Sequence, residues 1–106
     1  MESRKAISTT ALRRRLPPGT EFTAQLQFGP MAGQWLRRKV VKQSGWKMVS
    51  TILEGPKAGR EIDLQWKHTK VEECESGEIT LTMTDAPQNC NNGNVFLIIR
   101  IENKAA

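Results

Sequence analysis

From residue 21 onward, apolar and polar side chains alternate with a period of two. This period places one set of side chains on each face of a strand, whereas an amphipathic helix needs a period of about 3.6. The clearest examples are residues 22–28, 46–52, 62–66 and 79–83. The pattern therefore predicts half-buried β-strands.

Residues 95–101 are apolar on both faces apart from Arg100. Such a run is typical of a strand in the middle of a sheet. A charged strand around residues 36–42 brings the expected number to about six, and glycine- and proline-rich turns separate the strands. These features predict a small all-β, single-domain antiparallel barrel or sandwich over residues 21–106.

Residues 1–20 form a basic N-terminal arm with a different pattern. Ser8 or Thr9 is a suitable cap for a short helix that Pro17 and Pro18 would end. The spacing of Leu12 and Leu16 puts both leucines on one face, from which they could dock on the domain. A disordered basic arm is the alternative, because helices this short are marginal in water.

The pentapeptide at residues 29–33, Gly-Pro-Met-Ala-Gly, returns at residues 55–59 as Gly-Pro-Lys-Ala-Gly. The flanks also correspond, since Leu26 and Ile52 each stand three residues before the first glycine. Proline fixes one backbone angle and glycine permits turn conformations closed to other residues. The repeat predicts two tight strand connections and a duplicated hairpin; coincidence of turn chemistry is the alternative.

The first pentapeptide, followed by Val40 and Val41, resembles the G-P-x-A-G turn of KOW-type SH3-like barrels. Leu36 stands where that family usually has a further glycine, and Trp35 adds bulk at the turn. Members of the family mostly serve transcription and ribosome-associated proteins through RNA or polymerase contacts. The resemblance implies an SH3-like barrel whose loops touch nucleic acid.

Charge is divided unevenly along the chain, whose net charge is +5. Residues 1–70 contain 14 Lys and Arg against 5 Asp and Glu, whereas residues 71–106 contain 2 against 6. A folded domain with this division carries one strongly basic surface, which favours a polyanionic partner. Charge alone does not distinguish among DNA, RNA, an acidic protein and an anionic membrane as the partner.

The strand with Arg37, Arg38 and Lys39 is charged on both faces, which predicts an exposed edge strand or projecting hairpin beside Trp35. Lysine and arginine neutralise phosphates, and exposed tryptophan stacks on unpaired bases. Alternation places Trp46 and Trp66 in the core, whereas it does not decide whether Trp35 is buried or exposed. The candidate nucleic-acid-binding residues are Arg13, Arg14, Arg15, Trp35, Arg37, Arg38, Lys39, Lys42, Lys47, Lys57, Arg60 and Lys67.

If the two repeats lie side by side, these residues merge into one basic band. Glu72, Glu73, Glu75 and Glu78 are expected to form an acidic turn away from that band.

Catalytic signals are weak in this sequence. It has one histidine, no tyrosine, no Walker loop and no G-x-S-x-G motif, so an enzyme and a cofactor are not expected. His68 is in phase with apolar neighbours, which favours packing over catalysis. Together with Cys74 and Cys90 it lacks the paired spacing of a zinc site, so no metal is expected, and the two thiols are expected to stay reduced.

No apolar run approaches the roughly 20 residues that a membrane-spanning helix needs. Met1 is followed by Glu2, Ser3 and Arg4 without an apolar segment, so a secretory signal is not expected. The cytoplasm, or the nucleus in a eukaryote, is the expected compartment.

Three kinds of function fit these observations. The favoured one is a nucleic-acid-binding module of low base specificity, with a slight preference for single strands. The first alternative is a small interaction or inhibitor protein of phage or mobile-element type that binds an acidic protein. The second is an oligomeric structural protein whose copies join basic to acidic surfaces.

Overall fold

The computed structural model describes residues 4–84 and 94–101. It contains β1 (Arg4–Ile7), α1 (Thr9–Arg15), β2 (Glu21–Leu26), β3 (Trp35–Gln43), β4 (Lys47–Ile52), β5 (Glu61–Gln65), β6 (Thr69–Cys74), β7 (Ile79–Met83) and β8 (Val95–Ile101). All eight strands form one antiparallel sheet in the order β1-β6-β7-β8-β2-β3-β4-β5. The predicted all-β antiparallel class is therefore confirmed.

The described residues form eight strands, not six, because alternation missed β1 and β6. In β6 two adjacent glutamates, Glu72 and Glu73, mask the apolar pattern, and only Val71 and Cys74 are buried. Glu72 and Glu73 thus lie in a strand rather than in the predicted acidic turn. All four residues of the short β1 pair with β6.

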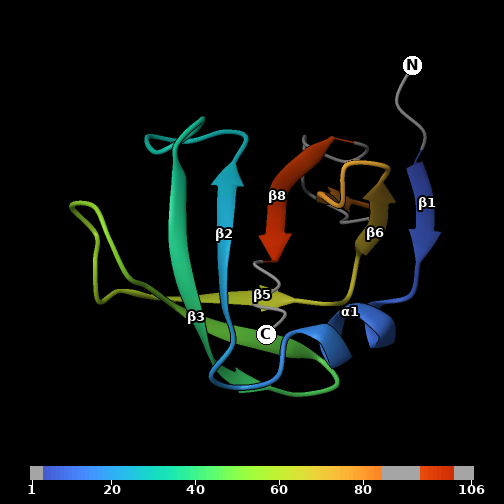
Figure 1. Cartoon of the computed structure of the whole chain (residues 1–106), viewed down its shortest axis with the longest axis horizontal. Coiled ribbons are helices and arrows are strands. Elements are labelled where there is room, and N and C mark those ends of the chain that lie inside the picture. The colour runs from blue at the N-terminus through green and yellow to red at the C-terminus, as the bar shows by residue number, and fades with distance from the viewer. Residues whose placement is uncertain (1–3, 85–93, 102–106) are drawn as a thin grey trace.

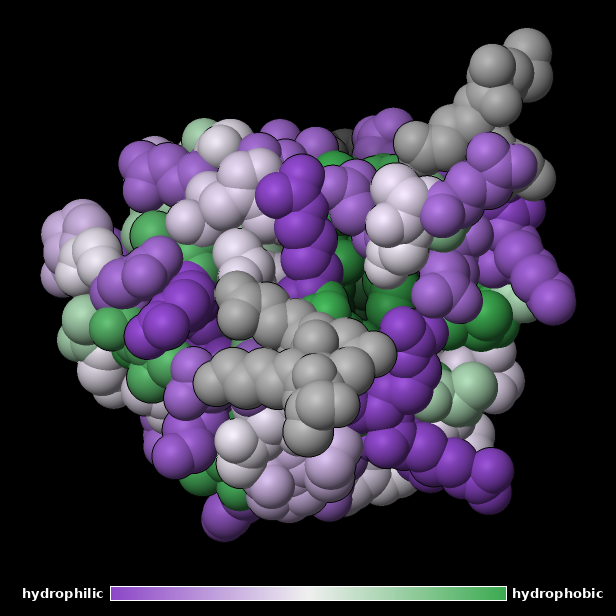
Figure 2. All heavy atoms as spheres, in the orientation of Figure 1, coloured by the Kyte–Doolittle hydropathy of each residue, from purple (hydrophilic) through white to green (hydrophobic). Residues whose placement is uncertain are grey.

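The sheet curves strongly around one core without closing into a barrel. In Figure 1, β3, β2 and β8 run side by side, as do β6 and β1, while β5 crosses their direction at a steep angle. Among the described residues, β1 and β5 are the two edges and do not pair with each other. The largest fully buried side chains include Phe22, Met48, Leu81 and Ile99. The face in Figure 2 is mainly hydrophilic, with apolar side chains visible between the polar ones.

The apolar segment Val95–Ile101 occupies the middle of this sheet, as predicted. It forms β8, which pairs with β7 on one side and β2 on the other. Leu97 and Ile99 are buried at 3% and 0% exposure. On the other face of β8, Phe96 and Ile98 are half-buried, so the second apolar face of this central strand is partly covered.

The predicted N-terminal helix forms and docks. The Ser8 hydroxyl accepts a hydrogen bond from the Ala11 backbone N–H at 3.0 Å, which caps the helix. Leu12 and Leu16 are both 0% exposed and belong to the main core. With β1 paired to β6 as well, the described part of the N-terminal segment is folded against the sheet rather than being a disordered arm.

The two pentapeptide repeats have the same backbone geometry. In the first, Gly33 N–H donates to Leu26 O at 2.9 Å; in the second, Gly59 N–H donates to Ile52 O at 2.7 Å. The first and last glycines of both repeats have positive φ between 84° and 94°. One turn joins β2 to β3 and the other joins β4 to β5, so the same hairpin connection occurs twice in the sheet.

Alanine at Gly55 is expected to destabilise the domain more than alanine at Gly59. Both positions have positive φ, so either change strains the backbone by about 1–3 kcal/mol. Only at Gly55 would the new Cβ meet a neighbour, Leu36 Cδ2, at 3.3 Å. Urea unfolding of the two variants measures the difference. Equal losses would show that Leu36 moves aside without cost.

Candidate nucleic-acid interface

The basic strand β3 is not an edge strand, so that prediction is wrong. It lies between β2 and β4, and its two faces have different surroundings. Arg38 points inward between Phe22 and Ile52 and is 4% exposed. Burial lowers the pKa of its guanidinium from the ordinary value, and its Nε has no hydrogen-bond partner. Arg38 therefore belongs to the core and is not a surface contact.

On the outer face of β3, Arg37 is exposed but balanced by carboxylates. Its Nη1 lies 4.0 Å from Glu21 Oε1, and its Nε lies 3.6 Å from Glu54 Oε1. Lys39 is also exposed and is the register partner of Glu21. This face consequently carries little excess positive charge for a polyanion.

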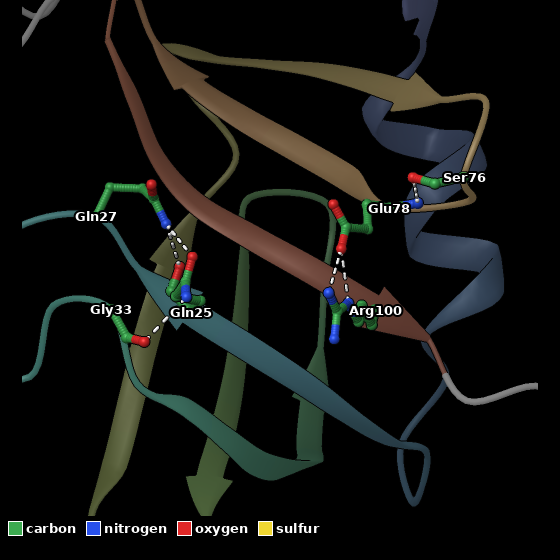
Figure 3. Close-up of polar contacts among 6 residues, drawn as sticks. All are labelled: Gln25, Gln27, Gly33, Ser76, Glu78 and Arg100. Carbon is green, nitrogen blue, oxygen red and sulfur yellow. Dashed lines mark hydrogen bonds and ion pairs between the residues drawn. The ribbon is translucent and has the colours of Figure 1, made fainter. Parts of the chain in front are cut away.

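Trp35, at the start of β3, has one ring face covered. The Arg100 guanidinium lies 3.9 Å from the ring centroid, and Arg100 Nη2 is 2.6 Å from Glu78 Oε2. Figure 3 shows Glu78 reaching Arg100, with Gln25 hydrogen-bonded to the Gly33 carbonyl nearby. Glu78 therefore lies close to Trp35, and the expected separation of the acidic segment from the basic band is not found. A half-buried ring under an arginine offers limited area for stacking.

A β-bulge in β3 reverses the side-chain pattern predicted for Lys42. Val40 is opposite Ser50 and Lys42 is opposite Val49, so Val41 is an extra residue. Strict alternation places Lys42 on the same face as Arg38, but the bulge turns Lys42 outward, where it is exposed. Bulges commonly re-aim side chains in this way.

Beyond the bulge, Gln43 turns inward and joins three parts of the fold. Its Oε1 accepts a hydrogen bond from Trp66 Nε1 at 3.2 Å, and its Nε2 donates to Leu16 O at 3.0 Å. Trp66 is 5% exposed, as predicted for a core residue. These bonds hold the end of α1, the end of β3 and the segment after β5 together.

Trp46 is 60% exposed, which corrects its predicted place in the core. It lies in the turn before β4, and Ser44 N–H donates to Lys47 O across that turn at 2.9 Å. The alternation of β4 therefore does not extend to Trp46. Lys47 Nζ lies 4.7 Å from the centroid of the Trp46 ring and 3.1 Å from Asp63 Oδ2.

A groove of about 450 Å³ lies beside this ring and is called the Trp46 groove below. Its walls include three apolar side chains, Pro18, Val41 and Trp46. Its polar lining consists of Lys42, Gln43, Ser44 and Lys47. Neither charge nor spacing singles out Pro18 and Val41 in the sequence, and alternation wrongly placed Trp46 in the core.

Further cations lie around the Trp46 groove. Arg13 Nη1 in α1 would be 3.4 Å from a Cβ at Gly45, so its guanidinium lies against the turn. Lys67 is exposed and follows Trp66, whose backbone N–H donates to Trp46 O at 2.9 Å. Arg14 is exposed on the same helix. This end of the domain brings together separate basic segments of the sequence.

The remaining candidates do not join this group. Lys57 and Arg60 are exposed in and beside the second repeat turn, at the opposite end of β4 from Trp46. Arg15 Nη1 is paired with Glu73 Oε2 at 3.1 Å. The structure thus separates the predicted band into a basic end around Trp46, a balanced face around Arg37 and a distant turn.

Other kinds of site have little support in the described residues. His68 is half-buried with φ 64° and lines a cavity of about 270 Å³ together with Leu64 and Phe96. Within residues 4–84 and 94–101, no group of three or more His, Cys, Asp or Glu is arranged to hold a metal ion. Cys90, the second cysteine considered for such a site, lies outside the described residues.

The single helix of the described chain is too short to cross a membrane. In comparisons with known proteins, no protein-family model, curated protein or solved structure matches the chain.

Proposed function

We propose that this domain binds nucleic acid through its basic end around Trp46, with low base specificity. The observation that carries this proposal is the 60% exposure of Trp46 beside Lys42 and Lys47 in one groove. Lysine and arginine neutralise phosphates, and an exposed indole offers a surface for a base. The function rests on binding and does not require a reaction.

The form of the binding elements supports low specificity. The described helix, α1, has seven residues, and its Leu12 faces the core instead of a groove of DNA. Sequence-specific readout in the major groove usually relies on a helix or a β-ribbon that presents several side chains to base edges. Contacts to phosphates position a nucleic acid without reading its sequence.

We further propose that the fold is a variant of the SH3-like barrel. The strongly curved antiparallel sheet and the two equivalent G-P-x-A-G turns support this assignment. In such a barrel, binding residues on connections at one end of the strands would form a continuous surface. The β3–β4 turn, the residue after Trp66 and α1 meet in that manner here.

The proposal predicts that Lys42→Ala combined with Lys67→Ala weakens nucleic-acid binding about tenfold or more. Each removed phosphate contact should also reduce the slope of log affinity against log salt by about 1. Fluorescence anisotropy with labelled DNA and RNA at several salt concentrations measures both quantities.

The matched control is Lys57→Ala combined with Arg60→Ala. It removes the same charge from two exposed positions at the other end of β4, so affinity should change little. Equal losses in both pairs would reduce the effect to overall charge and contradict a defined site. Absence of binding at low salt would overturn the proposal itself.

The open sheet edges favour protein association as a second candidate function. Among the described residues, β1 and β5 pair on one side only, and they carry Arg4 and Lys5 against Glu61 and Asp63. An exposed edge can accept a strand from another chain. Opposite charges on the two edges favour contact between unlike edges of two copies. A salt-tolerant complex or a discrete oligomer in sedimentation velocity would support this alternative.

A further inference from the structure

We infer that the Trp46 groove holds one unpaired nucleobase stacked on the indole ring, so that the domain selects single strands over duplexes. This inference rests on the proposed nucleic-acid binding and names the ligand of that same site. Its support comes from the exposure of the groove, the placement of its cations and the fixed position of its walls.

Exposed apolar area is concentrated at the Trp46 groove. The large hydrophobic residues that are exposed in the described chain are Phe28 at 40%, Val41 at 40% and Trp46 at 60%. Val41 and Trp46 both line the groove. Scattered apolar residues are normal on a protein surface, whereas contiguous ones often mark a binding site. A ligand with an apolar face would therefore be favoured here.

The ring of Trp46 combines a cation contact with a large exposed area. Lys47 lies over one face, and its ammonium is held by Asp63 at 3.1 Å. An aromatic ring has a second face, and the 60% exposure of Trp46 leaves it area on which to stack a flat molecule. Lys47 also lines the groove, so its positive charge would lie beside a bound nucleotide.

The size and chemistry of the groove suit a base with its phosphate. Ligand sites commonly have volumes of about 300–1,000 Å³, and this groove has about 450 Å³. Pro18 and Val41 provide apolar walls, while Ser44 offers hydrogen bonding to the edge of a base. Lys42 is exposed at the groove, and among the described residues no carboxylate forms an ion pair with it that would compete with a phosphate. A nucleotide unit combines these same apolar, polar and anionic features.

The groove is built on fixed elements. The bulge at Val41 sets the direction of Lys42, and Gln43 is bonded to Trp66 and Leu16 at 3.2 and 3.0 Å. A site held in place before binding loses less entropy when the ligand arrives. Trp35 differs, because Arg100 already covers its ring at 3.9 Å.

Selection of single strands follows from this arrangement. In a duplex each base is stacked between its neighbours, so its face reaches a protein ring only after the base is unpaired and turned out. A single strand exposes its bases at lower cost. Stacking on one aromatic side chain corresponds to an affinity gain of about 5- to 150-fold.

The test uses Trp46→Ala, Trp46→Phe and Phe28→Ala with three labelled probes. The probes are a single-stranded oligothymidylate, its counterpart made of abasic nucleotides, and a duplex of equal length, each of about 12 nucleotides or base pairs. DNA and RNA forms of the single strand and duplex are included. Far-UV circular dichroism and thermal unfolding verify that each variant is folded.

We expect Trp46→Ala to weaken oligothymidylate binding about 5- to 150-fold while the salt slope stays unchanged. Binding of the abasic strand and of the duplex should hardly change, because neither offers a base to the ring. Trp46→Phe should retain most of the affinity, and Phe28→Ala, which removes a different exposed aromatic side chain, should retain all of it.

Equal losses on all three probes, or no loss on oligothymidylate, would overturn the base-stacking inference. If the Lys42 and Lys67 double variant still weakened binding in that case, the proposed function would stand without it. If no probe bound at low salt, the base-stacking inference and the proposed nucleic-acid binding would both be contradicted.

Discussion

Replacing Leu12 with alanine is expected to lower the free energy of unfolding by about 2–5 kcal/mol. Leu12 is 0% exposed and packs in the main core although it belongs to the N-terminal segment. The loss combines the removed apolar contact with the cavity that remains. Because small domains have about 5–15 kcal/mol of stability, a large part of the total would be lost. Urea unfolding followed by circular dichroism measures it.

Arg14→Ala is the control in the same helix. Arg14 is exposed, and alanine favours helix formation, so its stability should remain within about 0.5 kcal/mol of the parent. A loss below about 1 kcal/mol for Leu12→Ala would contradict the docked helix, since a core leucine rarely costs so little.

Replacing Arg38 with methionine is expected to raise the free energy of unfolding by about 1–3 kcal/mol. Arg38 is 4% exposed between Phe22 and Ile52, and its Nε lacks a hydrogen-bond partner. Methionine fills similar space without a buried charge, so the desolvation cost disappears. Because the side chain is internal, affinity for nucleic acid should be unchanged. Thermal and urea unfolding test the first expectation, and anisotropy tests the second.

Arg37→Met gives the comparison on the outer face of β3. Arg37 is exposed beside Glu21 and Glu54, and exposed ion pairs contribute about 0–1 kcal/mol. Stability should therefore fall slightly or stay the same. If Arg38→Met destabilised the domain instead, its guanidinium would have to be compensated within the core.

Alternation predicted the strands in which one face is buried and the other faces solvent. The strands β2, β4, β5 and β7 carry this pattern, the continuous apolar run predicted the central β8, and a pair of leucines at helical spacing predicted the docked α1. β1 and β6 gave no such signal. They pair charged residues with each other, for example Lys5 with Glu73, so their strand character comes from the partner rather than from their own periodicity.

The candidate site was predictable in composition but not in geometry. Charge identified Lys42 and Lys47, yet it gave equal weight to Arg38, which the pleat turns into the core. Trp46 was misplaced because strand β4 begins one residue later. The contact between Arg100 and Trp35 joins residues far apart in the chain, and local spacing carries no information about it.

The extra residue at Val41 shifts the inward–outward alternation of β3 by one position for every residue that follows it. Before it, odd-numbered residues such as Lys39 face water; after it, the even-numbered Lys42 does, and Gln43 faces the interior. Deleting Val41 would leave Val40 opposite Ser50 and Lys42 opposite Val49, so regular alternation would still turn Lys42 outward and keep the Gln43 amide that bonds Trp66 inside. The two halves of β3 thus follow opposite rules: substitutions spare the fold at odd-numbered positions such as Lys39 before Val41, and at the even-numbered Lys42 after it.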